Sequence, residues 1–520
     1  HDVLTGPEWQ DPAHRLMNVD AIRMLAEGGL ADRTRQELFD EALELGTTVG
    51  VLLRPSEFVE HPQTRSRGFF TPVDLPGAER APMATFPMKL SATPATLRRP
   101  APGPDARDEF GERPAAPPAT PLTGELLLEG VRVVEIGTMA VVPEMAGVLA
   151  ELGADVIRVE SVAHPDGLRF AGSNGQLNQA FAFNAENRGS RSVTIDLTTE
   201  EGRELALRLC ASADVVAENQ RGGVVDRLGL GYDDVRAVNP AVVYASSQGY
   251  GRGGPLGEMP AYGPLNSGFA GVHLLWNHPD APYPCGTSLN HPDHIAGKLL
   301  ATAVLAALDH RQRTGEGQHI DMAQTETAAY MIGEVYLTAA LTGHDPAPTG
   351  NRRPDVAPHG VYPAAGDDRW IAIAVADDDA WRRLVAALGW DDDPALRTLE
   401  GRRAAHDELD ERLATWTRTH DPVEAATILQ EAGVSAMHVM GPADQHADEH
   451  LAGRAAIVSL EHPEVGTERH VGNPVRLSRL AQRVAASSPC LGAHTEEVLR
   501  EALGLSDDEL SRLDAAGVLR

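Results

Sequence analysis

The residue with the clearest chemical potential is Asp293, within the stretch Cys285–Gly297, which has the sequence CGTSLNHPDHIAG. A helix-forming run follows it, from Lys298 to Asp309. A carboxylate at the start of a helix lies where backbone N–H groups stabilise an anion. Such a carboxylate can cap the helix or act as a nucleophile that forms a covalent acyl intermediate. Taken alone, the stretch favours a cap, because capping is the commonest use of Asp at this place.

Other standard catalytic motifs are missing from the sequence. His291 and His294 flank Asp293, but the 20 histidines are scattered without a metal-ligand spacing, so we expect no bound metal. The sequence has no Walker A motif, no HExxH motif and no GxSxG elbow. The segment Gly137–Pro143, after the first expected strand, is not a GxGxxG loop, which disfavours a dinucleotide-dependent oxidoreductase.

Composition limits the partners and the compartment. The net charge of −30 argues against nucleic acid and anionic membranes as partners, although a few arginines could still hold a phosphorylated cofactor. Three distant cysteines, no apolar run of about 18 residues and no signal peptide predict a reduced cytoplasmic protein. The 520 residues predict about three structural units. The chain begins with His, so we expect further residues upstream in the natural protein.

Alternating strands and helices over residues 125–341 predict the large domain that positions Asp293. The expected helices are opened by Pro143 and by a capping box at Thr198–Glu201. This alternation is typical of an α/β fold with a Rossmann-like, mostly parallel sheet. Its ligands bind at the carboxyl ends of the strands, where Glu160, Glu218–Arg221 and Gln248–Gly251 are expected. The expected strands are Val131–Ile136, Val156–Glu160, Arg191–Asp196, Asp214–Glu218 and Ala241–Ala245.

A smaller α+β domain is expected over residues 342–459. It contains a strand at Asp368–Val375 and an amphipathic helix at Asp379–Leu388 that ends at Gly389. Residues 460–520 are expected to return to the large domain. A Pro-rich linker, 111–124, precedes the large domain, since its prolines cannot continue a helix or a central strand.

Residues 1–110 are interpreted as a partial repeat of the C-terminal part of the chain. Matching residues recur at a constant offset of 387 (433 − 46, 442 − 55, 478 − 91) without a gap. The segment therefore resembles the tail of a first copy whose front half is absent, and convergent loop composition is the alternative. The matching pairs are Gly46 and Gly433, Pro55 and Pro442, Arg67 and Arg454, Pro76 and Pro463, and the segments Pro87–Ser91 and Pro474–Ser478.

Ordered motifs run from about Leu126 to the end of the chain. They are Leu128–Val134, Leu152–Glu160, Asn187–Val193, Glu218–Asn219, Asp226–Gly229, Asn239–Pro240, Arg313–Gln318 and Leu491–Leu499. In this order they resemble the class III CoA-transferase family, of the formyl-CoA and carnitine-CoA transferase type. The resemblance implies an interlocked homodimer with a Rossmann-like large domain and a small domain. It also implies coenzyme A and acyl-CoA as substrates, with an organic acid as acceptor.

The resemblance assigns roles to individual residues. By position, Asp293 matches the family's catalytic Asp, which becomes an enzyme–CoA thioester by way of mixed anhydrides, and this reverses the preference for a cap. Asn219 and Arg227 match CoA-contacting positions in residue type, and Arg158 stands where a basic residue could meet a phosphate of CoA. Two further positions of the CoA site depart from the family. They are Gln220, which replaces an aromatic residue, and Ala140, which replaces a Gln.

Two other readings stay open at this stage. An isomerase or lyase could bind an acyl-CoA without exchanging it, with Glu326 or Asp321 as the acting carboxylate. A racemase on the same fold is the weaker form, because its Asp is replaced by Gly263 here. The third reading is a non-catalytic subunit of a larger assembly, in which residues 1–110 complete a partner's small domain.

Overall fold

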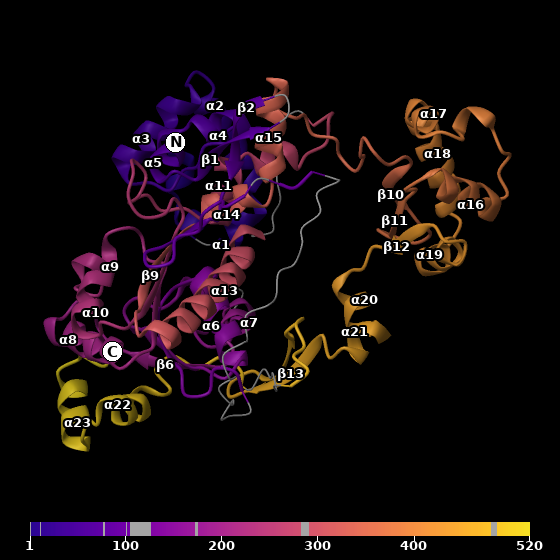
Figure 1. The fold of residues 1–520 in the computed structure, drawn as a ribbon. Helices are drawn as coiled ribbons and strands as arrows, with labels where there is room; N and C mark the ends of the chain where they lie inside the picture. The colour runs from indigo at the N-terminus through magenta and orange to yellow at the C-terminus, as the bar shows by residue number, and fades with distance from the viewer. Residues whose placement is uncertain are drawn as a thin grey trace, which may run out of the picture. The chain divides into compact units, whose positions relative to one another are not determined.

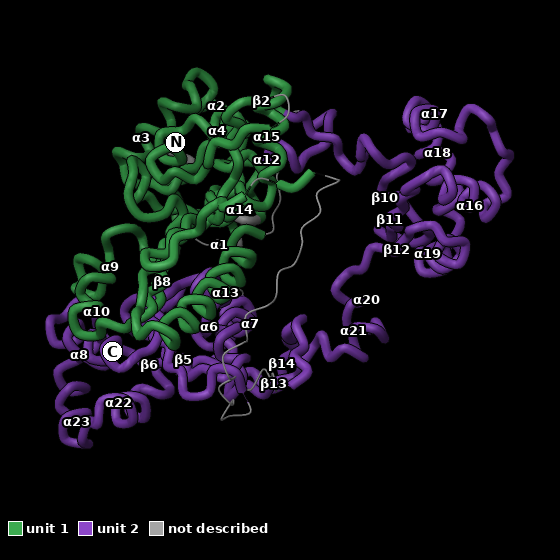
Figure 2. The backbone as a smooth tube through the Cα atoms, in the orientation of Figure 1, with its two compact units in different colours: residues 1–105, 217–272, 288–345 green, residues 106–216, 273–287, 346–520 purple. Residues whose placement is uncertain are grey.

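The computed structural model describes residues 2–10, 12–75, 78–99, 101–103, 126–171, 175–281, 291–479 and 486–520 (Figure 1). The predicted linker 111–124 lies outside these residues, as does the part of the Asp293 stretch before His291. The chain divides into two compact units (Figure 2). The first unit consists of residues 1–105, 217–272 and 288–345, and the second of residues 106–216, 273–287 and 346–520.

A seven-stranded sheet with the order β3-β9-β8-β7-β4-β5-β6 forms the main layer of an α/β fold. The pairs β4–β5, β5–β6 and β8–β9 are parallel, and β3 runs antiparallel to β9 at one edge. The five strands predicted from the sequence are confirmed, with ends shifted by up to three residues. The strands are β3 (Met88–Leu90), β4 (Arg132–Ile136), β5 (Asp155–Glu160), β6 (Ser190–Thr194), β7 (Val215–Glu218), β8 (Val243–Gln248) and β9 (Gln318–Ala323).

The central strands are buried along their whole length, which explains their β-branched, apolar sequences. Every residue of β7 and of β8 is buried. Strands covered on both faces lack the alternation of apolar and polar residues that marks a half-exposed strand. The sequence pattern therefore predicted the parallel sheet correctly.

Two predicted helix starts need correction. Helix α6 (Val141–Glu151) begins two residues before Pro143, which is tolerated at the third position because the first N–H groups of a helix have no partner within it. Helix α8 (Glu200–Ala211) is capped by Thr199, whose side chain accepts the N–H of Gly202. Thr198 instead bonds Asp196, so the predicted capping box is not formed.

The first unit joins the N-terminal segment to residues 217–345 through an aromatic core. Phe58, for example, meets Phe269 edge to face with ring centroids 5.7 Å apart. The predicted stop at Gly46 is confirmed, with φ at 64°. The other elements are η1 (Asp2–Thr5), η2 (Pro7–Gln10), α1 (Pro12–Met17), α2 (Val19–Leu30), α3 (Arg35–Leu45), α4 (Pro55–Glu60), α5 (Pro62–Arg67), β1 (Phe70–Leu75), β2 (Ala78–Ala84), α9 (Val224–Arg227), α10 (Tyr232–Val238), α11 (Gly263–Phe269), α12 (Val272–Leu275), α13 (His291–Thr314), α14 (Gln324–Tyr330) and α15 (Gly333–Thr342).

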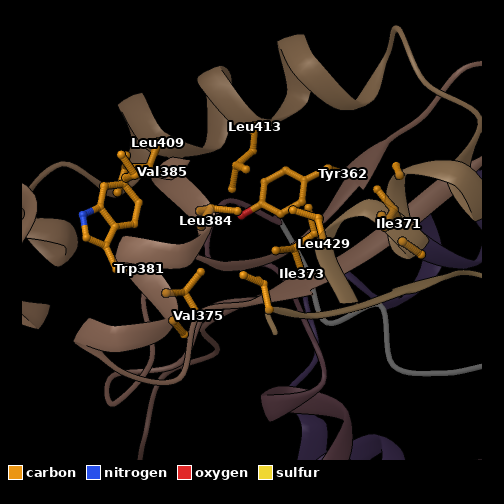
Figure 3. Close-up of a cluster of buried hydrophobic side chains, with 14 of the residues drawn as sticks. Tyr362, Ile371, Ile373, Val375, Trp381, Leu384, Val385, Leu409, Leu413 and Leu429 are labelled. Carbon is orange, nitrogen blue, oxygen red and sulfur yellow. The ribbon is translucent and has the colours of Figure 1, made fainter. Parts of the chain in front are cut away.

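The second unit contains a small antiparallel sheet, β10-β11-β12, with its own core. Figure 3 shows side chains from β10, β11, α16, α18 and α19 converging there, Trp381 and Leu384 among them. The predicted helix is confirmed as α16, capped by Asp377 and ended by Gly389. The elements are η3 (Gly167–Phe170), α7 (Phe181–Glu186), β10 (His359–Pro363), β11 (Trp370–Ala374), α16 (Asp378–Leu388), η4 (Pro394–Leu396), α17 (Leu399–Ala404), α18 (His406–Thr417), α19 (Pro422–Glu431), β12 (Ser435–His438), α20 (Pro442–Ala447), α21 (Glu449–Gly453), β13 (Ile457–His462), β14 (Gly466–Val471), α22 (Thr495–Leu503) and α23 (Asp507–Ala515).

The C-terminal helix α22 packs on strand β6 within the second unit. The hydroxyl of Thr495, the first residue of α22, accepts the N–H of Thr194 on β6 at 3.0 Å. No helix among the described residues is long and apolar enough to cross a membrane.

Candidate active site

Asp293 lies inside the first turn of α13, as the third residue of a helix that begins at His291. It therefore does not cap this helix, contrary to the reading that its position alone favoured. Only 8% of the residue is exposed. The first turn of a helix presents free N–H groups and the positive end of the helix dipole, which stabilise a negative charge.

Gly263, the first residue of α11, is a neighbour of the Asp293 carboxylate. Its backbone N–H donates a hydrogen bond to that carboxylate. A Cβ atom at position 263 would lie 2.6 Å from Oδ2 of Asp293 and 2.9 Å from its Cγ, so only glycine fits there. The other oxygen, Oδ1, is buried and has no hydrogen-bond partner within the described part of the chain. Within these residues, one carboxylate oxygen is thus left uncompensated.

Burial raises the pKa of Asp293 from 3.8 to about 6, because the charged form loses its hydration. The positive charge of His294 and the N–H of Gly263 act in the opposite direction and offset part of the effect. At pH 7 about nine-tenths of such a group is still ionised. The site therefore holds a charged but poorly solvated carboxylate, the state in which a carboxylate is most reactive as a nucleophile.

A buried chain of amide side chains fixes α11 beside α14. Nδ2 of Asn266 donates to Oε1 of Gln324 at 2.8 Å, and Nε2 of Gln324 donates to the hydroxyl of Ser247 at 3.4 Å. All three residues are buried. Because Asn266 lies one turn after Gly263, this chain holds the start of α11 in place relative to the carboxyl end of β8.

Three of the predicted CoA-site residues, Asn219, Gln220 and Arg227, follow β7 in one segment. Asn219 and Gln220 are half-buried, and Arg227 ends α9 in an exposed position. Glu218, fully buried at the end of β7, accepts the N–H of Gln220 at 2.9 Å and Nε2 of Gln248 at 2.8 Å. Burial raises the pKa of Glu218 to about 7. These bonds tie the segment after β7 to the end of β8.

Arg158 has a different environment from the one predicted for it. Its guanidinium is completely buried and pairs with Glu135 at 3.1 Å and with Asp166. Glu160 lies 3.4 Å away. Three carboxylates therefore surround this cation, and its role toward CoA stays a prediction. The acidic surroundings of Arg158 come from residues that the strand sequence alone does not place beside it.

Ala140 also belongs to the second unit, where it precedes α6. It is half-buried, and its carbonyl accepts the N–H of Glu144 at 2.8 Å. Its methyl side chain offers no hydrogen bond to a substrate, unlike the Gln that the resemblance leads one to expect.

Asp321 and Glu326, the carboxylates of the lyase reading, are both engaged by Arg67 of the N-terminal segment. Arg67 donates to Oδ2 of Asp321 at 2.9 Å and to Oε1 of Glu326 at 2.6 Å, and its side chain is only 2% exposed. The ion pair with Arg67 disfavours protonation of these carboxylates, although burial raises the pKa of Glu326 above its ordinary value. Sequence reasoning noticed Arg67 only as a repeated residue, and it did not identify Gly263 as the neighbour of Asp293.

A family model described as CoA-transferase family III matches residues 1–107 and 128–495. A relative from Mycobacterium tuberculosis, named "Probable CoA-transferase Rv1866", is 31% identical over 524 residues, which cover 97% of this chain and 65% of the relative. The chain thus spans about two-thirds of the length of this relative.

Two further comparisons cover about three-quarters of the chain. The succinyl-CoA–D-citramalate CoA-transferase of Chloroflexus aurantiacus is 32% identical over 395 residues, 75% of this chain and 98% of that one. The crystal structure of a CAIB/BAIF family protein from Brucella suis has a TM-score of 0.67 and 31% identity. It covers 73% of this chain and 100% of that protein.

Proposed function

Because the chain belongs to CoA-transferase family III, we propose that it transfers CoA from an acyl-CoA to an organic acid through an aspartyl-CoA thioester on Asp293. The observation that carries the proposal is the environment of this carboxylate. It is buried, its pKa is raised to about 6, and Oδ1 has no partner in the described structure. A purely structural Asp in a core is normally paired or hydrogen-bonded on both oxygens.

The reaction begins when a carboxylate oxygen of Asp293 attacks the thioester carbon of the donor. The C–S bond breaks, CoA leaves as a thiolate, and an acyl–aspartyl anhydride forms. The thiolate then attacks the aspartyl carbonyl of the anhydride, which releases the donor acid as a carboxylate and leaves CoA bound to Asp293 as a thioester. The energy of the original thioester is conserved in this intermediate.

The second half of the reaction repeats these steps in reverse order with the acceptor. The acceptor carboxylate attacks the aspartyl thioester, CoA leaves as a thiolate, and a new anhydride forms. The thiolate attacks the acceptor carbonyl, which yields the new acyl-CoA and regenerates the Asp293 carboxylate. No proton is gained or lost overall.

Gly263 supplies the one described hydrogen bond to the reacting group. Its N–H can donate to the oxygen that becomes negative each time the aspartyl carbonyl is attacked. The absence of a side chain at position 263 lets the backbone approach the carboxylate closely enough to make this bond. Gly263 stands where the racemases of this fold have their catalytic Asp. Its N–H and its lack of a side chain therefore favour acyl transfer over racemisation.

On the CoA side we assign Asn219, Gln220 and Arg227. Asn219 and Gln220 offer amide groups, and the exposed guanidinium of Arg227 suits a phosphate of CoA. The relative from Chloroflexus is named for succinyl-CoA, so succinyl-CoA is the first donor to test. The cytoplasmic location and the interlocked homodimer that the sequence leads one to expect remain part of this proposal.

The test is acyl exchange with the purified chain. Succinyl-CoA is incubated with a panel of isotope-labelled carboxylic acids, and new acyl-CoAs are measured by mass spectrometry. Exchange that is lost in Asp293→Asn, while the affinity for CoA measured by calorimetry is kept, supports the proposal. Exchange that survives Asp293→Asn refutes it. Deuterium incorporation at the α-carbon of an acyl-CoA without exchange favours the isomerase or lyase reading.

A further inference from the structure

The loop that follows β8, residues 249–257, is rich in glycine and carries one charge. Its sequence is GYGRGGPLG, so Arg252 is its only charged residue. A loop with five glycines has many conformations open to it, and ordering it costs entropy. In this protein hydrogen bonds to its backbone fix the loop, which gives the side chain of Arg252 a defined place.

Gln63 holds the loop at three points through its side-chain amide. Its Nε2 donates to the carbonyls of Tyr250 at 2.8 Å and Gly253 at 3.0 Å. Its Oε1 accepts the N–H of Leu256 at 2.8 Å. Gln63 itself is buried, so these bonds are shielded from water.

The backbone of Arg252 is held from both sides. Its carbonyl accepts Nη1 of Arg67 at 3.0 Å, and its N–H donates to Oδ1 of Asp321 at 3.1 Å. A Cβ atom at the preceding Gly251, where φ is 74°, would lie 2.3 Å from Cζ of Arg67. The close approach of Arg67 therefore requires glycine at this position.

The side chain of Arg252 contacts the segment assigned to CoA above, residues 219–227, which is here named the CoA segment. Its Nη2 donates to both carboxylate oxygens of Asp226, at 2.7 and 2.5 Å. Its Nη1 lies 3.5 Å from Oε1 of Glu218. Glu218 directly precedes the CoA segment, and Asp226 directly precedes Arg227, so Arg252 spans the segment from end to end.

The carboxylate of Asp226 stands at an unfavourable place for binding an anion. CoA carries negative phosphates, and the whole chain already has a net charge of −30. Asp226 and Arg227 are consecutive in α9, about 3.8 Å apart at their Cα atoms, well within the screening length of about 8 Å in physiological salt. Among the residues that the structure describes, Arg252 is the only arginine or lysine in an ion pair with Asp226 or Glu218.

The two carboxylates differ in how they would respond to the loss of Arg252. Burial raises the pKa of Glu218 to about 7, while the bond from Gln248 and the charge of Arg252 act to lower it. Without Arg252 this buried group would bind a proton at neutral pH and lose its charge. Asp226 is exposed, and an exposed carboxylate is ionised at pH 7. Asp226 is therefore the group whose charge needs a permanent partner.

We propose that Arg252 cancels the charge of Asp226 and thereby keeps the CoA segment attractive to the phosphates of CoA. Arg252 acts on the ligand through Asp226, so it is a positioning residue and not a catalytic one. Its role rests on the proposed function and deepens it, since it extends the determinants of CoA affinity to the glycine-rich loop. Direct contact between Arg252 and a phosphate is the competing arrangement.

The test compares the affinity of the full chain for CoA with that for pantetheine, which lacks the phosphates, by calorimetry. Arg252→Gln should weaken CoA binding by about three- to tenfold, through the repulsion of an unpaired Asp226, and should leave pantetheine binding unchanged. The loss should shrink as salt is raised, because salt screens this repulsion. Arg252→Lys keeps the charge and should retain most of the affinity. The control Arg23→Gln, in an exposed ion pair with Glu27, should change neither affinity.

The double variant Arg252→Gln, Asp226→Asn separates the proposal from direct contact with a phosphate. If Arg252 acts through Asp226, removal of both charges returns CoA affinity to nearly the wild-type value. A double variant that binds CoA as weakly as Arg252→Gln shows that Arg252 meets the phosphate itself, and this result overturns the proposal. The double variant leaves no unpaired charge, so it decides the question even if Arg252→Gln does not fold.

Two further outcomes bear on the proposal. Equal weakening of CoA and pantetheine in Arg252→Gln, at low and high salt alike, means that the residue only maintains the fold of the loop, and the proposal fails. A wild-type chain whose CoA affinity is insensitive to Arg252→Gln refutes this inference and leaves the proposed function intact. A wild-type chain that does not bind CoA refutes the proposed function and this inference together.

Discussion

Replacing Asp293 by Asn should abolish transfer and, at neutral pH, remove a cost to stability. The folded protein holds this carboxylate with a pKa of about 6, against 3.8 in the unfolded chain, because of its burial. Between these two values the folded state binds a proton that the unfolded state has lost. Stability of the wild-type chain therefore falls as pH rises from about 4 to about 6, and the deficit persists above that range.

The size of the effect follows from the gap between the two pKa values, roughly two pH units at 1.36 kcal/mol each. The free energy of unfolding of Asp293→Asn, relative to the wild type, should rise by about 2.5 kcal/mol from pH 4 to pH 7.5. The buried amide of Asn adds a constant term, because it has no partner at the place of Oδ1. That term does not depend on pH, so the slope isolates the carboxylate.

The assay is urea unfolding of both proteins at several pH values between 4 and 7.5. Asp309→Asn serves as the control, because Asp309 is an exposed residue of the same helix in a surface ion pair with Arg313. The control should give a small difference that varies little over this range. A difference between wild type and Asp293→Asn that stays constant, or shrinks as pH rises, would refute the account of a destabilised carboxylate.

Three further outcomes are expected. The value of kcat/KM should fall about tenfold per pH unit below about pH 6 and level off above it, because only the ionised Asp293 attacks the thioester; a flat profile down to pH 5 contradicts this. Gly263→Ala should lower kcat by about 10²-fold or more, since its Cβ displaces the carboxylate, whereas Gly28→Ala, in open space, should leave kcat unchanged. Arg158→Lys should lower the free energy of unfolding by about 1–3 kcal/mol without changing KM for the acyl-CoA, because the bonds lost are those to Glu135 and Asp166. A raised KM with normal stability would indicate instead that Arg158 binds a phosphate of CoA.

The sheet could be predicted because its signals are local. Runs of β-branched residues such as Val131–Ile136 alternate with helices whose ends carry Gly or Pro, and each signal is complete within about ten residues. The start of α13 was missed although Pro292, at its second position, is a recognised mark of a first helical turn. The run of helix formers after Lys298 gives the stronger helix signal and predicts a later start.

The partners of the site residues could not be predicted in this way, because they come from distant parts of the chain. Arg67 and Glu326 are 259 positions apart, and no periodicity links them. Arg158 has the residue type of a phosphate ligand, but three buried carboxylates around it decide its role. In the sequence, Gly263 stands out only because it replaces the Asp of the racemases. Its contact with Asp293 depends on the packing of α11 against α13, which the sequence does not show.

The most direct test of the central claim is the mass of the peptide that contains Asp293. The full chain is incubated with succinyl-CoA and quenched with hydroxylamine, which converts an aspartyl thioester or anhydride to a hydroxamate. We predict a hydroxamate on Asp293 in the wild type and none in Asp293→Asn. Acyl exchange without a hydroxamate on Asp293, or with the label on Glu326 instead, would contradict covalent catalysis by this residue.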